Sequence, residues 1–285
     1  MYRLVFWRLI LWRRSVREYV QRFRAWNVDG SRRLPYVVYM TGMPRTGTSF
    51  MKNFLGDYPG LCVRKFEPRG FYISWQAALH ANSDVFVDKS THYIRHLNNI
   101  RKACGRHTPV CVVVRDPRDQ LSSLFEFDRH PELPRNKRFW RRWVKQYSDL
   151  LEFSRKFPEQ PILLVRYEDL VRYPIEAKEY FLKWTGVMRD DEPVRNSYHV
   201  AHKNDIQDDN VSELASASTS SIGKHRFITD GKKLSVIKGY LTNARAQELM
   251  KSLGYDLDGI SDTIDLPRSI DFFCPSGRHK MPYQS

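Results

Sequence analysis

The segment from Gly42 to Ser49 has the residue types and spacing of a loop that binds an anionic group. Its sequence, GMPRTGTS, fits the pattern GxxxxG-x-[ST] and lies between an apolar run and a helical pattern. Backbone N–H groups at the start of a helix point toward a bound anion, and the helix dipole adds to the attraction. Thr48 occupies the position at which a nucleoside triphosphatase needs lysine, which argues against triphosphate chemistry. The cation of this loop is Arg45, and the alternative interpretation is a glycine-rich turn without a ligand.

A second segment, from Arg115 to Ser123, has the residues to bind another anionic group. Its sequence is RDPRDQLSS, and it follows the run VCVVV, which is typical of a buried strand. The arginine leaves the strand and the serine lies eight residues later, two turns into a helix, so both can face one phosphate. Arginine supplies a forked, permanently charged donor and serine a compact one. Alternatively, Arg115 pairs with a carboxylate at a strand end and Ser123 is an ordinary residue of a helix surface.

Taken together, the two segments resemble the motifs of the sulfotransferase superfamily. MPRTGTS is similar to its 5′-phosphosulfate loop and RDPRDQLSS to its 3′-phosphate motif, in the same order. The YEDL sequence at 167–170 is similar to a strand-end motif of the family, and SSIGK at 220–224 to a late loop that closes over the nucleotide. The resemblance runs over about residues 36–253 and is nearest to the tyrosyl-protein and heparan-type enzymes.

The resemblance implies an α/β fold of the P-loop type, with a central parallel sheet flanked by helices. It also implies sulfuryl transfer from 3′-phosphoadenosine 5′-phosphosulfate to an acceptor, adenosine 3′,5′-bisphosphate as product, and no metal. The chain departs from the cytosolic enzymes in having Arg45 instead of the loop lysine, and Lys-His-Arg at 224–226 instead of Arg-Lys-Gly. The residues that correspond to donor-binding positions are Arg45, Thr46, Gly47, Thr48, Ser49, Arg115, Ser123, Tyr167, Ser221 and Lys224.

Four residues are candidates for the chemistry of transfer. Arg45 and the loop amides can absorb the negative charge that develops on a phosphate leaving group. The acceptor needs a general base. Glu67, 22 residues after Arg45, is close to where tyrosyl-protein and heparan-type enzymes have a catalytic glutamate, and His92 resembles the histidine of the cytosolic Lys-Thr-His. Glu67 is favoured over His92, and Lys89 resembles a lysine that contacts donor or acceptor. The alternatives are an ion pair for Glu67, a surface position for His92 and a solvated Lys89.

The elements that would position these residues alternate between strand and helix, which predicts a parallel sheet covered on both faces. Short apolar runs predict buried strands at 36–41, 85–87, 110–114 and 162–165, with 110–114 in a central position. Helical patterns are found at 48–55, 94–105, after Pro117, and at 136–157, 175–184 and 234–253. Residues 187–230 are expected to form long loops, and the chain after Asp258 no clear element.

The composition favours one α/β domain with an anionic partner. The chain has 285 residues, 41% of them hydrophobic, and a net charge of +15. Its cysteines, at 62, 104, 111 and 274, show no CxxC pair and no zinc spacing, so they are expected to be reduced and the protein cytoplasmic. No Asp/Glu cluster suggests a metal site. We predict a basic amphipathic N-terminal segment at 1–35, a sulfotransferase domain at 36–258 and a C-terminal tail at 259–285.

The remaining basic residues leave several partners open. Residues 1–35 carry nine arginines and two acidic residues, so residues 1–24 are suited either to lie on an anionic membrane or to pack on the domain. The run 135–145 has six cations and no acid. The favoured interpretation is that its aromatic residues form a core stripe and its cations are solvated. The alternative is that the run binds an anionic acceptor or a membrane surface, and nucleic acid is not expected. The acceptor can be a carbohydrate, a lipid, a small alcohol or a peptide. Competing functions are a P-loop kinase of a small metabolite and a non-catalytic nucleotide- or polyanion-binding protein.

Overall fold

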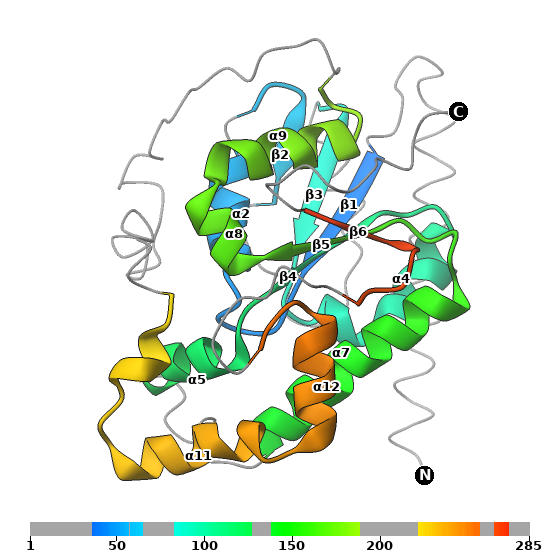
Figure 1. Ribbon diagram of the computed structural model, residues 1–285. Helices are drawn as coiled ribbons and strands as arrows, with labels where there is room; N and C mark the ends of the chain where they lie inside the picture. The colour runs from blue at the N-terminus through cyan, green and yellow to red at the C-terminus, as the bar shows by residue number, and fades with distance from the viewer. Residues whose placement is uncertain are drawn as a thin grey trace, which may run out of the picture.

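The computed structural model describes residues 36–56, 58–64, 83–126, 138–188, 222–256 and 265–273. Six strands form one sheet in the order β2-β3-β1-β4-β5-β6, and each neighbouring pair is parallel (Figure 1). The predicted α/β fold is confirmed. The strands are β1 (Tyr36–Thr41), β2 (Leu61–Val63), β3 (Val85–Lys89), β4 (Val110–Val114), β5 (Ile162–Arg166) and β6 (Ile270–Phe272).

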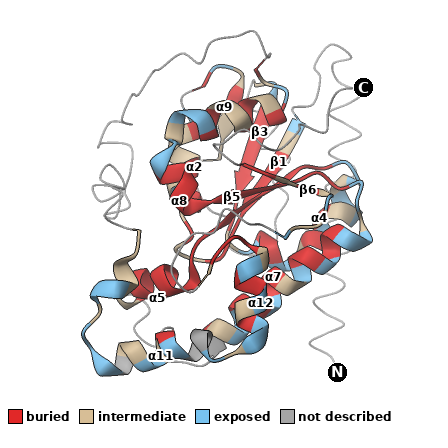
Figure 2. Ribbon diagram, in the orientation of Figure 1, coloured by how far each residue is buried: buried red, intermediate tan, exposed pale blue. Residues whose placement is uncertain are grey.

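Helices bury both faces of the sheet, as an all-parallel sheet requires. Successive residues of β1 point to opposite faces, so Val38 and Met40 join one apolar cluster and Tyr39 joins the other. One cluster is completed by α2 (Thr48–Leu55), α8 (Tyr167–Arg172) and α9 (Pro174–Trp184). The other is completed by α4 (Leu97–Cys104), α7 (Arg138–Lys156) and α12 (Ala244–Ser252). The sheet between them is almost wholly buried (Figure 2).

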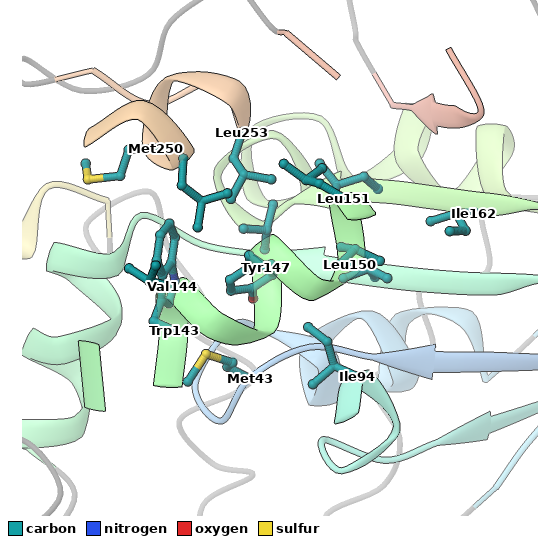
Figure 3. Close-up of a cluster of buried hydrophobic side chains, with 14 of the residues drawn as sticks. Met43, Ile94, Trp143, Val144, Tyr147, Leu150, Leu151, Ile162, Met250 and Leu253 are labelled. Carbon is teal, nitrogen blue, oxygen red and sulfur yellow. The ribbon is translucent and has the colours of Figure 1, made fainter. Parts of the chain in front are cut away.

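Helix α7 carries the aromatic stripe that the sequence suggested. Trp143, Tyr147 and Leu150 are fully buried and lie in one apolar cluster with Met43 of the loop after β1 (Figure 3). Arg141, Arg142 and Lys145 of the same helix are exposed. The stripe of the 135–145 run is therefore part of the core, and its described cations lie on the solvent side.

Several elements differ from the sequence prediction because they are too short to show periodicity. The three-residue strands β2 and β6 were not predicted, and β6 corrects the expectation that the chain after Asp258 has no clear element. The strand at 85–87 continues to Lys89, and α8 follows β5 directly. The stretch at 94–105 begins as a 3-10 turn, η1 (Tyr93–Arg95), before α4.

The periodic stretch at 234–253 is two helices, α11 (Gly231–Leu241) and α12. They are separated because the Asn243 side chain accepts a hydrogen bond from the Ala246 N–H at 2.9 Å and so begins a new helix. The expected long loops at 187–230 contain one described element near their end, the 3-10 turn η4 (Lys224–Phe227).

Cys62, Cys104 and Cys111 are free thiols, while Cys274 lies outside the described residues. Among the described helices, none combines the length and the apolar character needed to cross a bilayer. The basic segment 1–35, whose residues 1–24 are suited either to contact a membrane or to pack on the domain, lies outside the described residues. Most of the tail and residues 189–221 also lie outside them.

Candidate active site

Three neighbouring strands bring the two sequence motifs to one edge of the sheet. β1 lies between β3 and β4 and is parallel to both, so the chain leaves all three strands at the same edge. Lys89 ends β3, Gly42 follows β1 and Arg115 follows β4. From β1 the chain continues to β2 and β3 on one side of β1, and after β3 it crosses to β4 on the other side. The edge between β1 and β4 is thus a topological switch point, where open α/β sheets bind their ligands.

The loop from Gly42 to Ser49 is a tight turn that needs its glycines. A Cβ atom on Gly42 would lie 2.4 Å from the Val113 carbonyl oxygen, so only glycine fits beside β4. Gly47 has a φ of +93°, and a Cβ atom there would lie 2.2 Å from the ring of Tyr167. Arg45 also has a positive φ, 68°, a left-handed conformation that costs an L-residue roughly 1–2 kcal/mol. The loop is therefore held in a shape that it would not adopt alone.

Three hydrogen bonds from the second segment hold this shape. The Arg45 Nε donates to Ser123 Oγ at 2.9 Å, and Arg115 Nη1 donates to the carbonyl oxygen of Arg45 at 3.3 Å. Gln120 Nε2 donates to the carbonyl oxygen of Pro44 at 2.6 Å. Gln120 and Ser123 belong to α5 (Pro117–Phe125), which begins with Asp116 as its N-cap and proline in its first turn. The two motifs thus form one structural unit.

Arg115 is buried and points toward this unit. Its guanidinium carbon lies 4.4 Å from the centroid of the Tyr167 ring, and that ring also covers Gly47. The carboxylates at the neighbouring strand ends have other arginine partners, Asp116 with Arg118 and Asp169 with Arg166. Arg115 thus contacts the loop carbonyl and the ring, and its charge also acts on the nearby Glu168 carboxyl.

The start of α2 adds further donors at the same edge. Its N-cap is Gly47, which makes no side-chain capping hydrogen bond, and the first turn holds no acidic residue. Lys89 is buried and its Nζ donates to Ser49 Oγ at 3.1 Å. Thr48 is buried as well. Thr46 differs, because its Oγ1 donates to the Met43 carbonyl oxygen at 2.8 Å and so closes the turn from inside.

The remaining candidates make other contacts or lie outside the described residues. His92 is exposed, and its N–H donates to Ser90 Oγ at 3.2 Å. Lys224 lies at the far end of α5, where its Nζ donates to Glu126 Oε2 at 3.1 Å. Glu67 and Ser221 lie outside the described residues. Within the described ranges, no group of three or more His, Cys, Asp or Glu residues is suited to hold a metal ion.

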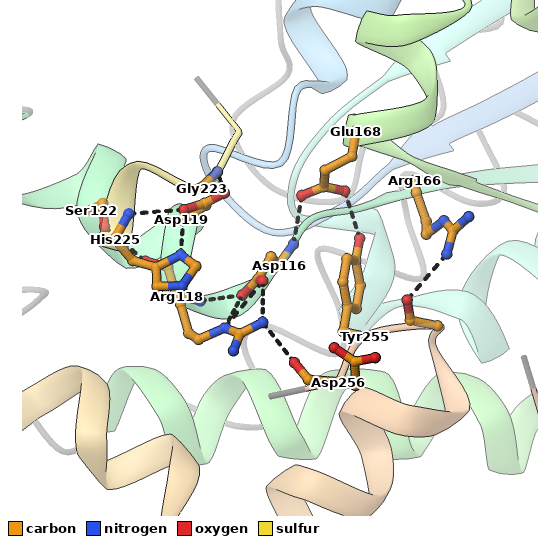
Figure 4. A network of polar contacts seen from close by, with 11 residues as sticks. Asp116, Arg118, Asp119, Ser122, Arg166, Glu168, Gly223, His225, Tyr255 and Asp256 are labelled. Atoms are coloured by element: carbon orange, nitrogen blue, oxygen red, sulfur yellow. Dashed lines mark hydrogen bonds and ion pairs between the residues drawn. The ribbon is translucent and has the colours of Figure 1, made fainter. Parts of the chain in front are cut away.

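A network of buried carboxyl groups lies next to the site (Figure 4). Glu168 Oε1 accepts from the Asp116 N–H at 3.0 Å, and Glu168 Oε2 accepts from the Tyr255 hydroxyl at 2.9 Å. Arg118 donates to Asp116 and to the carbonyl oxygen of Asp256. Burial, with the nearby Asp116 carboxylate, raises the pKa of Glu168 to about 7. This network fixes the ends of β4 and β5, from which Arg115 and Tyr167 project.

Residues 64–191 match the family model described as "Sulfotransferase family". Over these residues the chain is similar to that family. The match begins after the loop 42–49 and includes Arg115, Ser123 and Tyr167. The loop 42–49 contacts the matched second motif in the structure. A sequence comparison with curated proteins gives no match.

Solved sulfotransferase structures are similar to this chain at low identity. The sulfotransferase domain from the Synechococcus PCC 7002 olefin synthase is 16% identical, with a TM-score of 0.49, covering 75% of this chain and 97% of that one. The sulfotransferase domain from the curacin biosynthetic pathway is 16% identical, with a TM-score of 0.47, covering 79% and 100%. A sulfotransferase from Alicyclobacillus acidocaldarius is 12% identical, with a TM-score of 0.42, covering 68% and 94%.

The sequence analysis did not single out the residues that hold the site together. Gln120 and Asp119 lie inside the second motif, but their roles depend on residues 76 and more positions away. Asp116 could have been recognised as a helix cap, because an aspartate directly precedes a proline. No pattern in the sequence indicated the hydrogen bond between the Tyr255 hydroxyl and Glu168.

The Glu168 carboxyl predicts a specific pH dependence of folding. Its folded pKa, about 7, is above the ordinary value of 4.5, so the stability it contributes is present below pH 4.5 and is lost as the pH rises through 7. A shift of this size corresponds to about 3 kcal/mol. The quantity to compare is the unfolding temperature of Glu168→Gln minus that of the wild type. This difference should be more positive at about pH 8 than at about pH 5. Thermal unfolding without nucleotide measures this, and parallel pH profiles for the two proteins would contradict it.

Proposed function

We propose that the protein transfers the sulfuryl group of 3′-phosphoadenosine 5′-phosphosulfate to an acceptor hydroxyl or amine by in-line displacement. The observation that carries the proposal is the contact between the two motifs, with Arg45 Nε 2.9 Å from Ser123 Oγ and Arg115 against the Arg45 carbonyl. A nucleotide with phosphate groups at both its 3′ and 5′ positions has two anionic ends. Two cationic segments side by side are suited to bind both ends of one such molecule.

The side chains at this edge fit such a donor in charge and chemistry. Arg45, Lys89 and Arg115 bring three cations together, and the uncapped start of α2 adds backbone N–H groups. The loop 42–49 would hold the 5′-phosphosulfate, and Arg115 with Ser123 the 3′-phosphate. Tyr167 keeps the Arg115 guanidinium in place through its ring. Of the other proposed donor contacts, Lys224 and Ser221 belong to the late loop, which would have to contribute from the α5 side.

When bound, the nucleotide supplies an activated sulfuryl group and a phosphate leaving group. In this proposal Arg45, Lys89 and the loop amides would donate hydrogen bonds to that phosphate as it gains negative charge. Such donors lower the barrier most when they are already oriented. The three hydrogen bonds between the motifs provide this orientation, because they fix the Arg45 backbone and side chain. Removing one such donor typically costs about 10²–10³ in rate.

Ligand-dependent stability tests the donor against the competing kinase. Adenosine 3′,5′-bisphosphate without magnesium should raise the free energy of unfolding by about 2.7 kcal/mol at 100 times its dissociation constant, since it binds only the native state. ATP with magnesium should add little, because lysine is absent at Thr48. Thermal shift with each ligand measures the difference. Stabilisation by ATP with magnesium, but not by adenosine 3′,5′-bisphosphate, would favour the kinase. No response to either ligand would favour the non-catalytic protein.

The 3′-phosphate assignment predicts that Arg115→Ala weakens nucleotide binding by roughly 10- to 100-fold, as expected for a lost charged hydrogen-bond partner. Arg115→Lys should recover only part of the affinity, because lysine lacks the fork. The matched control is Arg101→Gln. Arg101 lies on α4, away from this edge, and pairs with Glu159. Calorimetry with adenosine 3′,5′-bisphosphate gives the constants. An Arg115→Ala protein that binds as tightly as the control would remove this residue from the site.

The general base is proposed to be Glu67, with His92 as the second candidate. Glu67→Gln should lower kcat by about 10²–10⁴ while nucleotide affinity stays unchanged, because only the proton transfer is lost. His92→Gln should have little effect if Glu67 is the base, because the proton acceptor is then retained. The assay follows labelled sulfate from the donor into a panel of cell extracts, which also identifies the acceptor. A loss confined to His92→Gln would assign the base to His92.

A further inference from the structure

The described part of the late loop, together with the 3-10 turn that follows it, contacts α5, the helix that carries the second motif. These residues, 222–228, are called the late loop below. It consists of a turn with Gly223 in the left-handed region, at φ +75°, followed by the 3-10 turn η4. None of the residues of η4 is buried, and Phe227 is 81% exposed. Ile222 and Ile228, at the two ends of this segment, are partly buried and pack against the two apolar clusters. Apolar packing therefore holds the ends of the segment, and the exposed turn between them depends on polar contacts.

One carboxylate makes most of the polar contacts between the loop and α5. Asp119 Oδ2 accepts from the Gly223 N–H at 2.6 Å, and Asp119 Oδ1 accepts from the His225 N–H at 3.0 Å. The same Oδ1 lies 2.7 Å from His225 Nδ1 (Figure 4). The Asp119 side chain is 2% exposed, so its charge is shielded from water and depends on these three donors. The Lys224–Glu126 pair is more exposed and is the weaker contact.

The position of Asp119 connects this contact to the donor site. Asp119 and Ser123 are four residues apart in α5 and therefore lie on the same face of the helix. Ser123 accepts from Arg45 of the loop 42–49, one turn further along. The same helical face thus holds the anion loop at one position and the late loop at the other.

We propose that Asp119 is a positioning residue, whose carboxylate holds the late loop against α5 so that Lys224 and Arg226 stay within reach of a bound nucleotide. The inference rests on the proposed function, because it assigns the loop's cations to the same donor. Asp119 contacts no reacting group and acts through the loop backbone. It is therefore distinct from Arg115 and Ser123, which are assigned to the phosphate itself.

The ionisation state of Asp119 is consistent with this role. Burial alone would raise its pKa, but the hydrogen bonds from His225 and Gly223 outweigh burial and lower the pKa below the ordinary value of 3.8. A carboxyl whose pKa is depressed in the folded protein contributes stability above its ordinary pKa, and loses it as the pH falls through the folded value. The carboxylate is thus charged, and the contact is formed, throughout the neutral range.

The experiment compares Asp119→Ala with His225→Ala and with Asp149→Asn in the full-length protein. Asp119→Ala removes the acceptor of both backbone N–H groups, whereas His225→Ala removes only the imidazole contact. Asp149 pairs with Lys145 on the exposed face of α7 and controls for the loss of a negative charge. Two quantities are measured: hydrogen exchange of the peptide over 222–228 without ligand, and the dissociation constant and rate for adenosine 3′,5′-bisphosphate.

We expect Asp119→Ala to lose exchange protection at the late loop while α12 stays protected, and to bind the nucleotide at least about 10-fold more weakly, mainly through faster dissociation. His225→Ala should keep most of the protection and affinity, and Asp149→Asn all of it. An Asp119→Ala protein that loses the protection but binds the nucleotide like the wild type would overturn the inference alone. A wild-type protein that fails to bind the nucleotide would contradict the proposed function and the inference with it.

Discussion

The parallel pairing of β1 with both β3 and β4 is the constraint on which the rest of the site depends. Parallel neighbours end at the same edge, so the pairing puts the residues after three strands next to one another without any contact between their loops. A loop rich in glycine and a second segment more than 70 residues later can then meet. The sheet supplies proximity, and the loops need only supply orientation. This division explains why the chemistry is concentrated at the edge between β1 and β4.

Orientation of the loop 42–49 comes from its neighbours rather than from the loop itself. A positive φ at a residue other than glycine is unfavourable, and it persists only where surrounding contacts over-determine it. At Arg45 those contacts are the hydrogen bond that its carbonyl oxygen accepts from Arg115 and the hydrogen bond that its Nε donates to Ser123 Oγ. The same interactions that define the candidate phosphate sites therefore also keep the loop in its conformation. Loop geometry and the second motif are, in this sense, one feature.

The sequence was sufficient for the parts of the fold that are long and periodic. The runs at 36–41, 110–114 and 162–165 and the stripe on α7 matched the structure because burial on both faces, or on one face, leaves a repeated pattern. β2 and β6 left none, because three residues contain no period. In the site, glycines and cations could be recognised by type and spacing. The supporting contacts could not, because Gln120, Asp119 and Glu168 act on partners that only the folded chain brings near.

The contacts that organise the site are mostly between a side chain and a backbone group of a distant segment. Arg115 and Gln120 donate to loop carbonyls, Asp119 accepts from late-loop amides, and Glu168 accepts from the Asp116 N–H. Such contacts fix the backbone without covering it with apolar side chains, which would exclude a charged ligand. They also hold the cations on the ligand side in place, so that these cations need to reorient little when charge develops on the ligand. A site for a highly charged molecule can therefore be rigid and still polar, provided that its buried carboxylates, here Asp116, Asp119 and Glu168, each have their donors.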